Sequence, residues 1–382
     1  MEADTKLASE SGCYVLEAAD FDTLFRALRA HGYEVIGPRL EGEAIVYERM
    51  DSVAELPRGW KDEQEAGHYR LHRRSDSAYF GYVVGPRSWK HFLYPPTEQL
   101  WTVRATSSGL SFEPSPPPRQ RYAFLGVRAC EIAAMEVQDR VFLSGAVRDE
   151  RYALRRASAL IIAVQCTEPA ATCFCTSMGT GPRAGRGFDL ALTELHDGQR
   201  HCFVVECGSE KGQALLAELP VRTARPEEQL AARERVEQAA RKITRHIPAT
   251  GVRDLLYRNL ESPRWAQVAS RCLACGNCTM VCPTCFCSTV EDTSDLQGEQ
   301  AERWRQWDSC FTLEFSHLAG GPVRPSIRSR YRQWLTHKLA TWFDQFGVSG
   351  CVGCGRCITW CPVGIDITEE VHAISEAEAR AR

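Results

Sequence analysis

The chain has 382 residues, a formal net charge of −3, 44% hydrophobic residues and 25% charged residues. These values are ordinary for a soluble globular protein with room for two or three domains. The small net charge provides no bulk field for nucleic acid or an anionic membrane, and no apolar run reaches the ~18 residues of a membrane span. We therefore expect neither kind of partner.

The N-terminal segment is acidic and polar and lacks the apolar stretch of a signal peptide, so we expect a cytoplasmic protein. The chain contains 18 cysteines. In a reducing compartment, cysteines are more often metal ligands or redox groups than disulfides.

The first part of the chain predicts a mixed α/β domain over residues 1–222. Apolar residues 122–127 and 159–165 are strand candidates, and a helical pattern at 131–142 lies between them. Strand, helix and strand in this order predict a βαβ unit with parallel strands. Residues 201–206 predict a further strand.

Helical patterns dominate our expectation for the rest of the chain. Residues 223–265 are interpreted as a helical connection that includes a helix at 224–246, with Pro226 in its first turn. Residues 266–382 are expected to form a mainly helical, ferredoxin-like domain, because a second long helix is predicted at 327–346.

Two copies of the motif C-x-x-C-G-x-C-x-x-x-C-P occur in this region, the second 79 residues after the first. In two-cluster ferredoxins, three cysteines of such a motif bind one 4Fe–4S cluster and the fourth ligates the other cluster. We therefore predict two clusters with crossed ligands. The first cluster takes Cys272, Cys275, Cys278 and Cys361, and the second takes Cys351, Cys354, Cys357 and Cys282.

Other residues of the two motifs agree with this assignment. Gly276 and Gly355 let the backbone approach a cluster closely, and Pro283 and Pro362 turn the chain away after the fourth cysteine. Structural zinc is the alternative, but it usually takes two C-x-x-C pairs or includes histidine, which neither motif contains.

A third cluster is predicted in the α/β region. Cys130 and Cys166 follow the two predicted parallel strands, and the carboxyl ends of such strands are where open α/β sheets bind ligands. Cys130 would also begin a helix, whose dipole favours a thiolate. Cys173 and Cys175 follow in a short loop that could fold over the same edge. The alternative is that all four are ordinary buried cysteines.

Several cysteines exceed these needs. Cys285 and Cys287 could be spare ligands, a redox dithiol or packing residues, and packing is favoured; Cys310 is equally open. Cys13, Cys202 and Cys207 are interpreted as structural. We expect the basic residues between 324 and 338 to form a solvated helix face in preference to a docking face; they are Arg324, Arg328, Arg330, Arg332 and Lys338. No standard nucleotide-binding glycine motif is present.

The sequence resembles the iron–sulfur beta subunit of cytosolic NiFe hydrogenases of the sulfhydrogenase type, and the similar iron–sulfur subunit of anaerobic sulfite reductase. The matching segments span about residues 80–365. They are Gly85-Pro-Arg-Ser-Trp-Lys-His-Phe-Leu-Tyr-Pro-Pro96, Gly126-Val-Arg-Ala-Cys-Glu131, Cys173-Phe-Cys175, the run from Cys272 to Cys287 and Trp307-Asp-Ser-Cys310. Ala129 and Glu131 depart from the Pro and Asp expected in the family, whereas Cys130 matches.

The resemblance implies an electron-transfer subunit of a multi-subunit oxidoreductase, most simply an NAD(P)-linked NiFe hydrogenase. Its partners would be a flavin subunit that binds NAD(P)H and the small and large NiFe subunits, with ferredoxin or polysulfide as external acceptor. In a sulfite reductase the chain would instead supply a sirohaem subunit. Two other functions are alternatives: independent reduction of a polysulfide or disulfide at Cys285 and Cys287 or at the third site, and a redox sensor, which is disfavoured because two coupled clusters exceed a sensor's needs.

Overall fold

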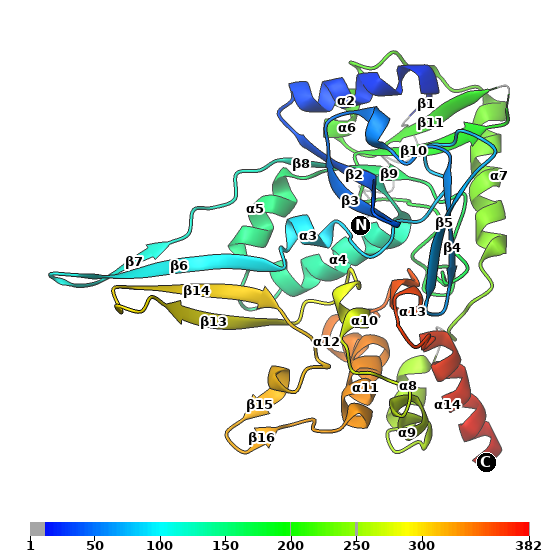
Figure 1. Cartoon of the computed structure of the whole chain (residues 1–382). Helices are drawn as coiled ribbons and strands as arrows, with labels where there is room; N and C mark the ends of the chain where they lie inside the picture. Colours follow the sequence, from blue (N-terminus) through cyan, green and yellow to red (C-terminus); the bar gives the residue numbers. More distant parts are fainter. Residues whose placement is uncertain (1–11, 199, 249–250, 382) are drawn as a thin grey trace.

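The computed structural model describes residues 12–198, 200–248 and 251–381. Its largest element is an eight-stranded mixed sheet in the order β12-β1-β11-β10-β9-β8-β2-β3 (Figure 1). The strands are β1 (Cys13–Glu17), β2 (Glu34–Glu41), β3 (Ala44–Met50), β8 (Tyr122–Val127), β9 (Leu160–Val164), β10 (Leu190–His196), β11 (His201–Cys207) and β12 (Arg222–Thr223).

The centre of this sheet is parallel. Strand β8 pairs with β9, which pairs with β10, and β8 also pairs with β2. Every residue of β8 and β9 is buried, as expected for parallel strands that are covered on both faces. The predicted strands and their parallel pairing are confirmed. The predicted helix is observed as α4 (Ala129–Leu143) and is followed by α5 (Glu150–Ser158) before β9 begins.

Helices cover both faces of the sheet. Strand β11 illustrates the reason, because its apolar side chains point to both faces. Successive side chains of a strand point to opposite faces. Phe203 stacks on Phe21 of α2 with ring centroids 4.5 Å apart, whereas Val204 packs in a cluster with Ala232 of α7. The covering helices include α2 (Phe21–Ala30), α6 (Glu210–Leu216) and α7 (Pro226–Lys242), and α4 packs in the same core as the central strands. Helix α7 confirms most of the helix predicted at 224–246.

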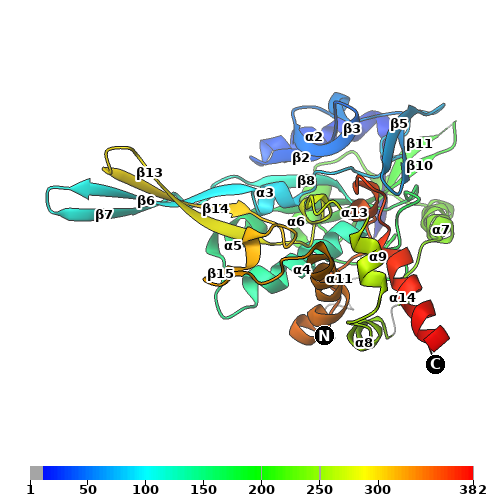
Figure 2. The same cartoon turned by 60° about the horizontal axis from the view of Figure 1, so that its bottom comes forward.

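A four-stranded antiparallel arm projects from the body in both views (Figures 1 and 2). Its order is β13-β14-β6-β7, with β6 (Thr97–Thr106), β7 (Gly109–Pro114), β13 (Ser288–Ser294) and β14 (Gln300–Trp307). The expectation that residues 266–382 are mainly helical is therefore not confirmed. Residues 288–307 form a β-hairpin, and its strand β14 pairs with β6, which lies about 200 residues earlier in the chain.

A second hydrophobic core lies among the C-terminal helices and includes Trp265, Leu335 and Ile358. The helices are α8 (Val252–Arg258), α9 (Arg264–Ala269), α10 (Asn277–Met280), α11 (Ile327–Thr336), α12 (Trp342–Phe346), α13 (Arg356–Thr359) and α14 (Ile367–Ala381). The helix predicted at 327–346 is confirmed, with a π-helical turn, η4 (His337–Thr341), between α11 and α12. Arg330 and Lys338 are buried, so the expected solvated basic face is wrong for these two residues.

The remaining elements are short. They are η1 (Ala18–Asp20), η2 (Val53–Glu55), β4 (Trp60–Glu65), β5 (His68–Arg73), α3 (Lys90–Leu93), η3 (Glu314–Ser316), β15 (His317–Leu318) and β16 (Gly321–Pro322). The division of the chain at residues 222 and 265 stays a prediction. Within the described residues, no helix is both long enough and apolar enough to cross a membrane.

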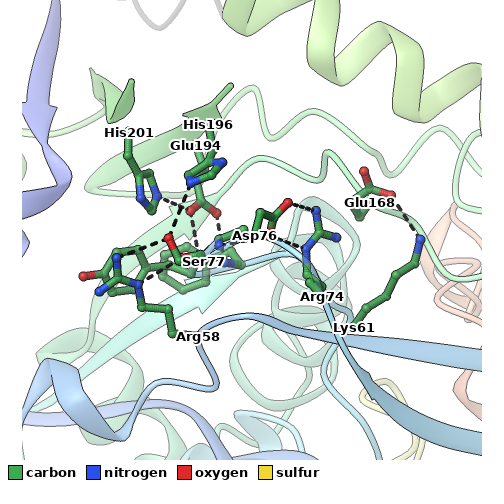
Figure 3. Close-up of polar contacts among 12 residues, drawn as sticks. Arg58, Lys61, Arg74, Asp76, Ser77, Glu168, Glu194, His196 and His201 are labelled. Carbon is green, nitrogen blue, oxygen red and sulfur yellow. Dashed lines mark hydrogen bonds and ion pairs between the residues drawn. The ribbon is translucent and has the colours of Figure 1, made fainter. Parts of the chain in front are cut away.

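Segment 74–84 is fixed by polar contacts with residues of β10, where Asp76 and Ser77 lie beside Glu194 and His196 (Figure 3). Glu194, near the end of β10, accepts backbone N–H groups from Tyr79 at 2.6 Å and Phe80 at 2.9 Å. His201 also lies 2.7 Å from the Glu194 carboxylate, and Arg74 pairs with Asp76 at 2.6 Å. The carbonyl oxygens of Phe80 and Tyr82 in this segment accept hydrogen bonds from Arg128, the residue that follows β8.

A buried carboxylate, Glu98, contributes to the junction between the arm and the body. Glu98 of β6 contacts Arg305 of β14 and also Arg155 and Arg151 of α5, with Arg151 Nε at 2.7 Å. Burial raises the pKa of Glu98, but hydrogen bonds from Arg155 and Arg151 outweigh it, and the pKa lies below its ordinary value. The ionised carboxylate therefore belongs to the folded state.

Glu98→Ala should lower the free energy of unfolding by about 3–5 kcal/mol, because it leaves the buried guanidinium of Arg155 without its carboxylate partner. Anaerobic urea unfolding followed by tryptophan fluorescence measures the change. The matched control is Glu113→Ala on the same arm: Glu113 and its partner Arg104 are 57% and 53% exposed, so the loss should be about 1 kcal/mol or less. Equal losses in the two variants would contradict the role given to Glu98.

Candidate iron–sulfur sites

The two C-terminal motifs fold into nearly identical loops. Gly276 and Gly355 both have φ of 76° and precede the one-turn helices α10 and α13, which carry the third cysteine of each motif. This left-handed conformation favours glycine. At Gly355 space is also decisive, because a Cβ there would lie 2.4 Å from the carbonyl oxygen of Thr172.

One cavity, called here the helical cavity, is lined by all four cysteines predicted for the first cluster: Cys272, Cys275, Cys278 and Cys361. Tyr331 and Trp334 of α11 line it as well. Their hydroxyl and indole N–H are buried and have no hydrogen-bond partner among the described residues. Such orphaned donors are unusual in folded proteins, and they suit a bound group that accepts hydrogen bonds.

The four cysteines predicted for the second cluster form a central thiol group, Cys282, Cys351, Cys354 and Cys357. Burial raises the pKa of Cys351 to about 12, and the nearby thiols of Cys354 and Cys282 add to the increase. Burial also raises the pKa of Cys357, which the other three thiols increase further. Buried Lys338 donates from Nζ to Cys282 Sγ at 3.2 Å.

The structure brings the cysteines of the predicted third site together at the edge of the sheet. Cys130, Cys166, Cys173 and Cys175 line one cavity, called here the sheet-edge cavity. Cys130 lies in the first turn of α4, directly after β8, and Cys166 lies two residues after β9. Cys173 and Cys175 come from the loop that follows, as the sequence predicted.

This loop is anchored by the residue between its two cysteines. Phe174 is fully buried in the C-terminal hydrophobic core, and its backbone N–H donates to Gly353 O at 2.9 Å. Thr180 Oγ1 donates to Val352 O at 2.6 Å. The loop of the third site therefore packs directly on the loop that carries Cys351 and Cys354.

Two buried arginines line the sheet-edge cavity. Arg128 donates to the carbonyls of Phe80 at 2.8 Å and Tyr82 at 2.6 Å, both in segment 74–84. Arg356 pairs with Glu131 at 2.6 Å. Nε of Arg128 and Nη1 of Arg356 are nevertheless buried without a partner among the described residues.

These features fit an anionic 4Fe–4S cluster held by thiolates. Burial raises the pKa of Cys175 to about 12 and that of Cys130 well above its ordinary value, so burial outweighs the helix dipole that was expected to favour a Cys130 thiolate. Binding of metal ions deprotonates a coordinating thiol outright. The unpaired N–H groups of the two arginines could then donate to the sulfur atoms of the cluster.

The three thiol groups are contiguous. Cys354 belongs to the central thiol group and also lines the sheet-edge cavity. Cys357 belongs to the same group and also lines the helical cavity. The central thiol group therefore lies between the two cavities.

Sequence reasoning missed the charged and aromatic side chains around the thiols. Arg128 and Arg356 stand two residues from Cys130 and Cys354, and this adjacency was the available signal. Tyr331 and Trp334 fit the apolar face of a predicted helix, and nothing in that pattern points to a cavity. Lys338 is predicted on a solvated face but is buried beside the thiols.

Comparison with known proteins agrees with the motifs. Residues 271–365 match the family described as the 4Fe-4S dicluster domain. The chain is 36% identical over 259 residues to sulfhydrogenase 2 subunit beta of Pyrococcus furiosus, which covers 67% of this chain and 75% of that protein. No solved structure matches the chain. Residues 271–365 are thus a 4Fe–4S dicluster domain, and the chain belongs to the family of the sulfhydrogenase beta subunits.

Proposed function

We propose that this chain is the electron-transfer subunit of a hydrogenase-type complex, with three 4Fe–4S clusters bound in a row. The observation that carries the proposal is the contiguity of the three thiol groups through Cys354 and Cys357. When bound, 4Fe–4S clusters supply one-electron oxidation and reduction. A row of adjacent clusters would let electrons pass between the sheet-edge cavity and the helical cavity through the central thiol group.

The proposed ligands are those predicted from the two motifs and, for the third cluster, from the carboxyl edge of the parallel strands. Cys272, Cys275, Cys278 and Cys361 hold one cluster, Cys351, Cys354, Cys357 and Cys282 hold the central one, and Cys130, Cys166, Cys173 and Cys175 hold the third. Other residues that line the two cavities would influence the bound clusters. Arg128 and Arg356 provide positive charge at the sheet-edge site, which favours electron uptake there, and Tyr331 and Trp334 exclude water from the helical site.

The proposed partners follow from the family. The Pyrococcus furiosus relative is a subunit of a sulfhydrogenase. We infer a complex with the small and large NiFe subunits and with a flavin subunit that binds NAD(P)H. Ferredoxin or polysulfide would be the external acceptor. The chain would relay electrons between the flavin side and that acceptor.

Anaerobic purification of the tagged chain from its native host should co-purify NiFe hydrogenase subunits and a flavoprotein, because an electron carrier needs a donor and an acceptor within reach. Mass spectrometry identifies the bound chains. Recovery of a sirohaem protein in their place would assign the chain to a sulfite reductase. Recovery of the chain alone, with its clusters intact, would count against a role within a complex.

Iron analysis tests the number of clusters. Three occupied sites predict about twelve irons and about twelve acid-labile sulfides per chain. Anaerobically purified protein should be analysed after reconstitution, with protein determined by amino-acid analysis. A stable value of about eight irons would reject the third cluster, and stoichiometric zinc would overturn the cluster assignment.

Cys175→Ser should remove about four irons and one signal from the EPR spectrum of the reduced protein, because it deletes one thiolate of the sheet-edge site. Cys202→Ser is the matched control, since Cys202 is a buried cysteine of β11 in a hydrophobic cluster with Ala232 of α7. The control should keep its full iron content and its spectrum. An unchanged spectrum in Cys175→Ser would show that Cys175 is not a ligand.

A further inference from the structure

Two cysteines that belong to none of the three thiol groups meet at the base of the arm. Cys287 directly precedes β13 and Cys310 follows β14. Ser288 pairs with Trp307, and the Asp308 N–H donates to Cys287 O at 2.9 Å, so the antiparallel register brings the two ends together. The sulfur of Cys287 lies close enough to the thiol and the backbone N–H of Cys310 for both groups to lower its pKa.

Two buried lysines stand beside this pair. Lys90 is 2% exposed and Lys338 is 4% exposed. Lys90 Nζ donates to Cys285 O at 3.2 Å and lies 3.7 Å from the centre of the Trp307 ring. Among the residues that the structure describes, no carboxylate forms an ion pair with either lysine. Since a buried ammonium group is costly without an anion, the neighbouring thiols are suited to supply negative charge.

The two thiols differ in acidity in the way that disulfide chemistry needs. The hydrogen bond from Cys310 lowers the pKa of Cys287 to about 7 despite burial, and Lys338 and Lys90 lower it further. The same hydrogen bond raises the pKa of Cys310. A thiol with a pKa near the ambient pH is the most effective attacking group in thiol–disulfide exchange.

The pair is also close to the sites of electron transfer. Cys310 lies near enough to Cys278 for that thiol to raise its pKa. Lys338 lowers the pKa of Cys287 and also donates a hydrogen bond to Cys282 of the central thiol group.

We propose that Cys287 and Cys310 form a redox-active dithiol at the base of the arm. On oxidation, each thiol loses one proton and the pair together loses two electrons as the bond between the two sulfur atoms forms. On reduction, two one-electron iron–sulfur carriers each supply an electron, two protons are taken up, and the sulfur–sulfur bond breaks. The dithiol would exchange one electron at a time with iron–sulfur clusters and two electrons at once with a partner that contains a disulfide.

This inference goes beyond the relay, and it can be tested on the full-length, anaerobically purified protein. Samples are equilibrated either with oxidised glutathione or with dithionite, quenched in acid with N-ethylmaleimide and mapped by mass spectrometry. We expect a peptide linked through Cys287 and Cys310 in the oxidised sample and its loss in the reduced one. The transition should follow a two-electron Nernst slope when glutathione ratios are varied.

Variants separate the dithiol from other roles of the same residues. Cys310→Ser should abolish the linked peptide while leaving iron content and the EPR spectrum unchanged, and Cys207→Ser, a cysteine at the end of β11, should leave all three unchanged. Loss of iron in Cys310→Ser would overturn the proposal in favour of a metal ligand. Alkylation of both cysteines in every sample of the unmutated protein, or a disulfide between Cys282 and Cys285, would also overturn it.

Iron content measured in the same samples keeps the two proposals apart. Protein that contains no iron but forms the disulfide would refute the cluster relay and support the dithiol. Protein with its full iron content and no disulfide would do the reverse.

Discussion

The buried ion pair between Arg356 and Glu131 is the contact on which the arrangement of the sites depends. Arg356 lies between two cysteines of the second motif, and Glu131 follows Cys130 at the start of α4. Glu131 also accepts hydrogen bonds from Tyr47 at 2.9 Å and from the Arg128 N–H at 3.1 Å. One carboxylate thus joins the dicluster loop, the main sheet and the loop after β8, and so sets the distance between the central and sheet-edge sites.

Buried positive charge lies beside two of the three thiol groups. Arg128 and Arg356 line the sheet-edge cavity, and Lys338 contacts the central thiol group. Neutral thiols would leave these cations poorly compensated, whereas metal-bound thiolates would balance them. The buried cations are therefore suited to anionic iron–sulfur clusters. Cluster binding should stabilise the folded chain as well as supply the redox chemistry.

The arm shows how distant segments can form one element. Strand β14 pairs with β6, and Glu98 fixes both to α5. The base of the arm carries Cys287 and Cys310, so the same antiparallel register that builds the arm also brings the two thiols together. Cys287 and Cys310, whose roles the sequence left open, therefore lie at the same place in the fold.

The sequence by itself determined the local features: the two cysteine motifs, the glycines at φ of 76°, the strands β8 and β9, and most of the helices predicted at 224–246 and 327–346. These depend on residue spacing and on neighbours within a few turns of chain. Only the tertiary structure decided the strand pairing of 288–307 with β6, the burial of Lys338, and the meeting of Arg128, Arg356 and Cys354 at one cavity. Those contacts join residues tens to hundreds of positions apart, and periodicity carries no information about partners at such distances.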